Sequence, residues 1–140
     1  MPEVDVVTEE KLDIQQIASY WVDEAEEALA VAEHLYEKGD YSYCLFFGHL
    51  AVEKLLKGIY VQRKKEHAPP IHNLVRLAQL AGIKSDESRV EQLALISTFN
   101  IEARYPDLQR SFRKKCTQEF ARENMELTRE TLQWLKAMMM

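Results

Sequence analysis

Apolar side chains recur every three or four positions along most of this sequence, a spacing that places them on one face of an α-helix. Gly39 follows the first such run as a suitable helix stop, and a second helix is expected from Asp40 to about His67. The centre of this second helix, YCLFFGHLAV (residues 43–52), is apolar on nearly every side, so we expect it to be the most buried helix. The inner face of the first helix consists of Ile14, Ala18, Trp21, Ala25, Ala28, Ala32 and Leu35.

The Pro-Pro pair at 69–70 breaks the second helix, because proline has no amide hydrogen for the helical ladder. A short helix should follow. Ser85 or Asp86 can cap the next helix, which Pro106 is expected to end, and Thr117 can cap the last one. The inner faces of these three helices are Ile71, Leu74, Val75 and Ala78; Val90, Leu93, Ala94, Ser97 and Ile101; and Phe120, Leu127, Thr131, Trp134 and Met138.

No stretch alternates apolar and polar residues, so no β-sheet is expected. The pattern predicts an all-α fold, an up-and-down bundle of four long helices with one short helix inserted. We expect residues 14–140 to form a single domain and residues 1–13 to be a mobile acidic tail. Gly48 and Gly58 weaken the propensity of the central helix, which indicates that neighbouring helices approach closely there.

Composition narrows the class of protein. The chain has 140 residues, 46% of them apolar, with four Gly and four Pro, which is typical of one packed domain. Cys44 and Cys116 lie far apart without a zinc-type spacing, so neither a metal site nor a cofactor is expected. The N-terminus lacks the features of a signal peptide, and no apolar run approaches the roughly 18 residues of a membrane span. We therefore expect a cytoplasmic protein without membrane contact.

The distribution of charge is more informative than the net charge of −5. Residues 54–76 carry a net charge of +5, residues 104–115 carry +4, and the rest of the chain carries −14. An acidic protein with its cations in two segments suggests a local anion site if both segments share one face. The alternative is that cations near helix ends only complement the helix dipole and stay solvated.

Several motifs, in this order, resemble the HEPN domain family. They are a helix rich in Ala and Glu, then AVEKLLK (residues 51–57), HNL (72–74) after the Pro-Pro pair, and RYPD (104–107) before a closing amphipathic helix. The resemblance covers about residues 14–137. It implies a helical bundle that commonly forms a homodimer and functions with RNA or nucleotides. Many members are encoded beside a minimal nucleotidyltransferase in toxin–antitoxin pairs, in which the HEPN protein is a metal-independent ribonuclease.

The catalytic signature of that ribonuclease branch is absent from this sequence. In the branch an Arg is followed, after four to six residues, by a His. Arg104 is the counterpart of the arginine, but residues 109–111 are Gln, Arg and Ser, and no His follows His72. Metal-free cleavage needs groups that exchange protons near neutral pH, and Arg scarcely does so. Arg104 is thus an expected anion clamp, and the chain is not expected to be an enzyme of the usual kind.

Two neighbours of Arg104 extend this candidate site. Tyr105 can stack a base while the guanidinium holds a phosphate, or it can be a core aromatic at the base of the bundle. Asp107 is expected to cap or tether the loop by pairing with Arg104 or Arg110.

The central helix and the following loop supply the other candidates. Lys54 is free to meet an anion, whereas Lys57 lies four residues after Glu53 and can form a plain intrahelical ion pair. His72 can orient the loop after the Pro-Pro pair, or substitute for the missing base if it lies beside Arg104.

Three functions follow. The preferred one is a non-catalytic HEPN protein that binds nucleotide or RNA phosphates and acts with a nucleotidyltransferase partner, in which Arg104, Tyr105, Lys54 and Lys57 meet in one groove. The first alternative is a degenerate ribonuclease with His72 or Tyr105 as substitute base. The second is a helical oligomerisation module, which predicts an exposed apolar patch and no salt-sensitive anion binding.

Overall fold

The computed structural model describes residues 12–139, and within them all regular structure is helical, which confirms the predicted all-α class. The acidic tail expected at residues 1–13 lies, for residues 1–11, outside the described residues. Asp13 caps the first described helix, since its carboxylate accepts a hydrogen bond from the Gln16 amide at 3.1 Å. The helices are α2 (Ile14–Lys38), α3 (Tyr41–Lys64), α4 (Leu74–Leu80), α5 (Glu87–Ser97), the 3-10 helix η2 (Ile101–Ala103), α6 (Pro106–Lys115) and α7 (Gln118–Ala137).

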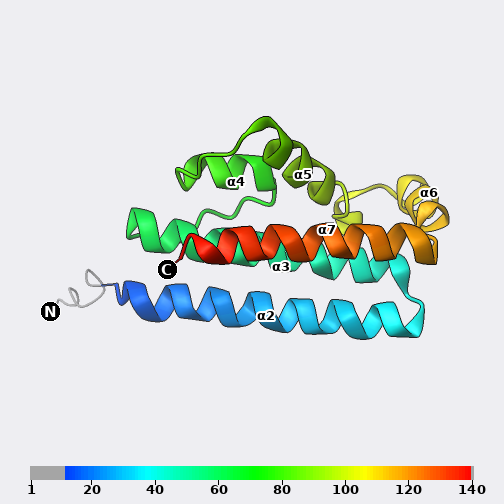
Figure 1. The fold of residues 1–140 in the computed structure, drawn as a ribbon, viewed down its shortest axis with the longest axis horizontal. Coiled ribbons are helices and arrows are strands. Elements are labelled where there is room, and N and C mark those ends of the chain that lie inside the picture. The colour runs from blue at the N-terminus through cyan, green and yellow to red at the C-terminus, as the bar shows by residue number, and fades with distance from the viewer. Residues whose placement is uncertain (1–11, 140) are drawn as a thin grey trace, which may run out of the picture.

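Helix α3 is the central helix, as its apolar composition predicts. It packs against α2, α4 and α7, and it also contacts η2 and α6 (Figure 1). Most of its side chains from Cys44 to Val61 are buried. A Cβ added at Gly48 would lie 3.3 Å from Thr128 Cγ2, and one at Gly58 would lie 3.3 Å from Trp21 Cβ. The expected close approach of neighbouring helices at both glycines is therefore confirmed.

Short-range signals set most helix ends. Gly39 ends α2 in the left-handed conformation, with φ 83°, and its N–H bonds back to the last turn. Of the two candidate caps for α5, Asp86 is used, and its carboxylate accepts from the Arg89 amide at 2.8 Å. Thr117 caps α7 by accepting from the Phe120 amide at 3.1 Å. These caps satisfy amide groups that have no partner inside their own helix.

The prediction was wrong about the segment around Pro106. Helix α5 does not continue to Pro106 but ends at Ser97, where the Thr98 hydroxyl donates back to the Leu95 carbonyl at 2.6 Å. Pro106 is instead the first residue of α6. Proline suits that position because the missing N–H would have no helical acceptor, and its fixed φ is already helical. Acidic Asp107 in the first turn and the cations 113–115 in the last turn then complement the helix dipole.

Helix α6 lies at the end of the bundle where α7 begins and α3 starts (Figure 1). Phe112 is its buried residue, and its ring centroid lies 5.9 Å from that of Phe99. On the side facing α3, Arg113 donates a hydrogen bond to the Tyr43 hydroxyl at 2.9 Å. Four of the five cations of 104–115, namely Arg110, Arg113, Lys114 and Lys115, are therefore carried by a helix that packs against the bundle, and Arg104 precedes this helix.

Candidate functional site

A groove between α5, α6 and the start of α7 contains Arg104, and we call it the Arg104 groove. Its volume is about 360 Å³. The polar side chains lining it are Thr98, Arg104, Ser111 and Lys115, and the apolar ones are Leu95, Phe99, Phe112 and Phe120. No carboxylate is among these described lining residues. Two cations, two hydroxyls and a wall of aromatic rings thus meet in one place.

Both cations of the Arg104 groove rest on aromatic rings. The Arg104 guanidinium lies over Phe112, 5.3 Å from the ring centroid, and donates to the Thr98 carbonyl. Lys115 Nζ lies 5.5 Å from the Phe120 centroid. These contacts position the two charges while leaving most of their N–H donors unused.

The pKa of the neighbouring Cys116 thiol depends on the same two positive charges. Burial raises the pKa of Cys116 to about 11, while Lys115 and Arg104 act on it in the opposite direction. Both cations are therefore close enough to favour an anion at this point of the structure.

Tyr105 and Asp107 lie at the N-terminus of α6, close to Arg104 in the chain, and neither is among the residues that line this groove. The Tyr105 side chain is 79% exposed, which excludes the core alternative for this residue. Asp107 accepts a hydrogen bond from the Leu108 amide at 3.0 Å. In the described part of the chain it forms no ion pair with Arg104 or Arg110, so the predicted tether is absent and Arg104 is not neutralised by it.

Lys57 and His72 belong to a second cluster, built around the buried carboxylate of Glu53. Oε2 of Glu53 lies 3.1 Å from Lys57 Nζ and 3.0 Å from His72 Nδ1. Glu53 is only 5% exposed, and Lys57 also lies over the Trp21 ring at 5.5 Å. The predicted Glu53–Lys57 ion pair is confirmed, but it is a buried pair and includes His72 as a third member.

His49 completes this group, which we call the Glu53 cluster (His49, Glu53, Lys57 and His72). Its imidazole is 1% exposed, and neither ring nitrogen has a hydrogen-bond partner. Nε2 lies 3.6 Å from Glu53 Oε1. Burial lowers the pKa of His49, and the carboxylate of Glu53 opposes that effect. His49 is thus a buried, neutral imidazole.

The structure does not bring Lys54 and Lys57 to the groove of Arg104. Lys54 Nζ is paired with Glu24 Oε1 on α2 at 2.9 Å, so it is not free for an anion. The two cationic segments also lie at opposite ends of α3, since Arg113 contacts Tyr43 near its start and Arg63 lies near its end, where it donates to the Gly82 carbonyl at 3.0 Å. From Tyr43 to Arg63 the helix rises about 30 Å, at roughly 1.5 Å per residue.

A further groove is lined in part by residues between Phe99 and Arg104, and we call it the His72 groove. It has a volume of about 280 Å³ and is lined by Phe46, Leu50, His72, Asn100, Glu102 and Ala103. Sequence reasoning missed Asn100 and Glu102, for which no motif gave a signal. It also missed the separate roles of Ser111 and Lys115, although Lys115 was part of the cationic segment.

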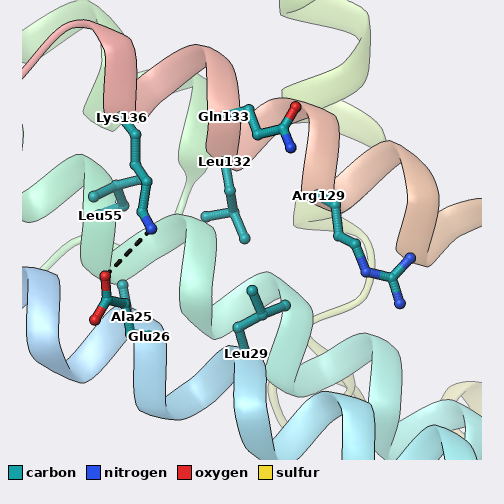
Figure 2. Close-up of a pocket in the computed structure, with 8 residues that line it drawn as sticks. All are labelled: Ala25, Glu26, Leu29, Leu55, Arg129, Leu132, Gln133 and Lys136. Atoms are coloured by element: carbon teal, nitrogen blue, oxygen red, sulfur yellow. Dashed lines mark hydrogen bonds and ion pairs between the residues drawn. The ribbon is translucent and has the colours of Figure 1, made fainter.

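A third groove lies between α2 and α7, and Leu55 of α3 also lines it (Figure 2). Its floor is apolar, and its rim carries two ion pairs, Arg129 with Glu33 at 2.7 Å and Lys136 with Glu26 at 3.2 Å. The hydrogen bond from Arg129 lowers the pKa of Glu33. Because each cation already has a carboxylate partner, this groove is a poor anion site.

Two other classes of site are absent from residues 12–139. No group of three or more His, Cys, Asp or Glu residues in this part is arranged to hold a metal ion. In the Glu53 cluster the ammonium of Lys57 contacts the carboxylate instead. None of the described helices has the length and apolar character needed to cross a membrane.

Comparison with known proteins agrees with the geometry of the fold. The HEPN domain family model matches residues 18–138. Among solved structures, TT1696 from Thermus thermophilus is similar over 86% of this chain and 96% of that chain, with a TM-score of 0.70 and 24% sequence identity. At this identity the likeness concerns the fold alone. No match was found among curated proteins.

Proposed function

Because this chain belongs to the HEPN domain family, we propose that it is a non-catalytic member that binds the phosphates of nucleotides or RNA and acts with a nucleotidyltransferase partner. The observation that carries the proposal is the Arg104 groove. It combines Arg104 and Lys115 with the hydroxyls of Thr98 and Ser111 and has no carboxylate among its described lining residues. A phosphate in this groove meets donors and positive charge without a competing internal anion.

The aromatic character of the groove supports a nucleotide rather than an inorganic anion. The guanidinium of Arg104 lies over the ring of Phe112, and the ammonium of Lys115 lies over the ring of Phe120. The exposed ring of Tyr105 is next to Arg104 in sequence. Proteins that bind single strands without strong sequence preference combine cations along the backbone with aromatic rings that stack bases.

The same groove lacks a group suited to proton transfer. Arg and Lys stabilise charge, but cleavage of RNA also requires a residue that accepts a proton from the 2′-hydroxyl. His72 is hydrogen-bonded to Glu53 and lines the neighbouring groove. The ribonuclease alternative therefore needs Tyr105 or a group from a second subunit as its base, and among the described residues Tyr105 forms no hydrogen bond with the Arg104 guanidinium.

The binding site is tested with a labelled single-stranded RNA of about twelve nucleotides in excess EDTA, measured by fluorescence anisotropy. Arg104→Ala and Lys115→Ala should each weaken binding about tenfold or more, because each removes charge-assisted hydrogen bonds. Arg122→Ala is the matched control, since Arg122 is an exposed cation on α7 paired with Glu126. Affinity should also fall steeply with salt.

Two outcomes would contradict the proposal. Unchanged affinity in Arg104→Ala would remove the groove as the binding site. RNA cleavage that Arg104→Ala abolishes would restore the ribonuclease alternative, which the same samples reveal on a denaturing gel. The partnership is tested separately, by co-expression with a minimal nucleotidyltransferase protein and size-exclusion chromatography. A joint peak is expected, and two separate peaks would exclude a stable complex.

A further inference from the structure

The chain segment from Thr98 to Arg104 lines both the His72 groove and the Arg104 groove. Ala103 lines the first groove, and the next residue in the chain, Arg104, lines the second. Consecutive Cα atoms are about 3.8 Å apart. A nucleotide whose phosphate lies on Arg104 can thus extend its sugar and base along this segment toward the His72 groove.

The polar atoms of the His72 groove are mainly hydrogen-bond acceptors. Nδ1 of His72 lies 3.0 Å from the Glu53 carboxylate, which can only accept, so Nδ1 donates this hydrogen bond, and in the neutral imidazole Nε2 is then an acceptor. The Glu53 carboxylate is itself held by Lys57. The His72 side chain is 66% exposed. Glu53 therefore fixes the orientation of the imidazole from the buried side, while the other side of the ring is accessible to a ligand.

The other two polar groups complete the pattern. Glu102 is exposed and contributes two acceptor oxygens, while Asn100 contributes an amide that both donates and accepts. The negative charge of Glu102 repels a phosphate. Phe46 and Leu50 supply apolar surface for a flat ring. The groove therefore suits a neutral, planar group with several N–H donors.

We infer that the His72 groove binds the guanine base of the nucleotide whose phosphate the Arg104 groove holds. Guanine has two adjacent donors, N1–H and the N2 amino group, beside the O6 acceptor, which match a carboxylate and an amide donor. Adenine and cytosine place a ring acceptor next to their single amino group, and uracil places carbonyls on both sides of its N–H. These acceptors face a carboxylate unfavourably. The inference rests on the proposed function and adds a base preference to it.

The test uses the full chain with GMP, AMP, CMP and UMP, and with four RNA decamers that differ in one central base within an otherwise uniform strand. Isothermal titration should give about tenfold tighter binding for the guanine ligands, because only guanine forms one or two additional hydrogen bonds with a charged acceptor. Glu102→Gln should remove this preference by lowering the affinity for GMP toward that for AMP. Glu91→Gln, an exposed carboxylate on α5, is the control and should keep the preference. Circular dichroism confirms that each variant is folded.

The outcomes separate this inference from the proposed function. Equal affinity for all four bases, together with a loss in Arg104→Ala, overturns the base preference and leaves phosphate binding intact. A guanine preference that survives Glu102→Gln also overturns the inference. Absence of binding by every ligand overturns both. Preference with GMP as well as RNA supports a free nucleotide as sufficient ligand, and preference with RNA alone supports a guanine within a strand.

Discussion

Glu53 on α3 and His72 in the loop before α4 are joined by a contact of 3.0 Å between Oε2 and Nδ1. The carboxylate is buried and also binds Lys57, whereas the imidazole is largely exposed. This contact anchors the loop that follows the Pro-Pro pair to the central helix. It therefore couples the stability of the core to the orientation of a side chain in the His72 groove.

Loss of the Glu53 charge should destabilise the fold strongly. In Glu53→Gln the ammonium of Lys57 stays buried without its counter-ion, and such a change costs about 3–5 kcal/mol. The matched control is Glu24→Gln, because the Glu24–Lys54 pair is partly exposed and is worth about 1 kcal/mol or less. Urea unfolding followed by circular dichroism measures both. Equal losses in the two variants would show that the buried pair contributes no more than the exposed one.

The buried imidazole of His49 should make stability depend on pH. Burial lowers the pKa of His49 below its ordinary value of 6.5, and the carboxylate of Glu53 opposes this effect. Protonation consequently favours the unfolded chain, so the contribution of His49 is complete above pH 6.5 and is lost as the pH falls through the lower folded value. We expect wild type to lose more stability than His49→Leu between about pH 7.5 and about pH 5.

A second histidine provides the control for this measurement. His34 is exposed on α2, and His34→Leu should keep the wild-type dependence of the urea midpoint on pH. If His49→Leu and wild type show the same dependence, His49 is not the responsible group.

Phe112 should decide whether α6 stays docked. Its ring is buried against Phe99 and lies under the guanidinium of Arg104. Phe112→Ala removes a contact worth about 3–5 kcal/mol, and since α6 is peripheral we expect local opening. Amide hydrogen exchange of residues 106–115 should accelerate while α3 stays protected, and RNA affinity should fall. Leu108→Ala, at a position 50% exposed, should change neither quantity. Full protection of α6 in Phe112→Ala would refute this dependence.

Sequence reasoning succeeded where a structural feature depends on neighbouring residues. The caps at Asp86 and Thr117 formed as their side chains allow, and the two glycines of α3 lie where other helices come close. It was wrong about Pro106, because proline is compatible with the first turn of a helix as well as with the end of one. The tertiary contact of Phe112 with the core favours the helix over a charged loop.

The candidate site was predicted less completely, because its members come from distant parts of the chain. Arg104 lines a groove and the ring of Tyr105 is exposed, while their role in anion binding stays a prediction. Lys54 and Lys57 instead pair with Glu24 and Glu53. Helical periodicity indicates which face of α3 a lysine occupies, but it contains no information about the carboxylate that the next helix places opposite.

By itself the sequence determined the helical class, most helix ends, the membership of a family and the lack of a histidine after His72. These properties depend on residue identity and on interactions within three or four positions. Only the tertiary structure decided that Glu53 meets His72, that Lys115 joins Arg104 in one groove, and that the two cationic segments lie at opposite ends of α3. Each of these depends on how separate segments pack around α3, and packing selects partners by shape and burial rather than by distance along the chain.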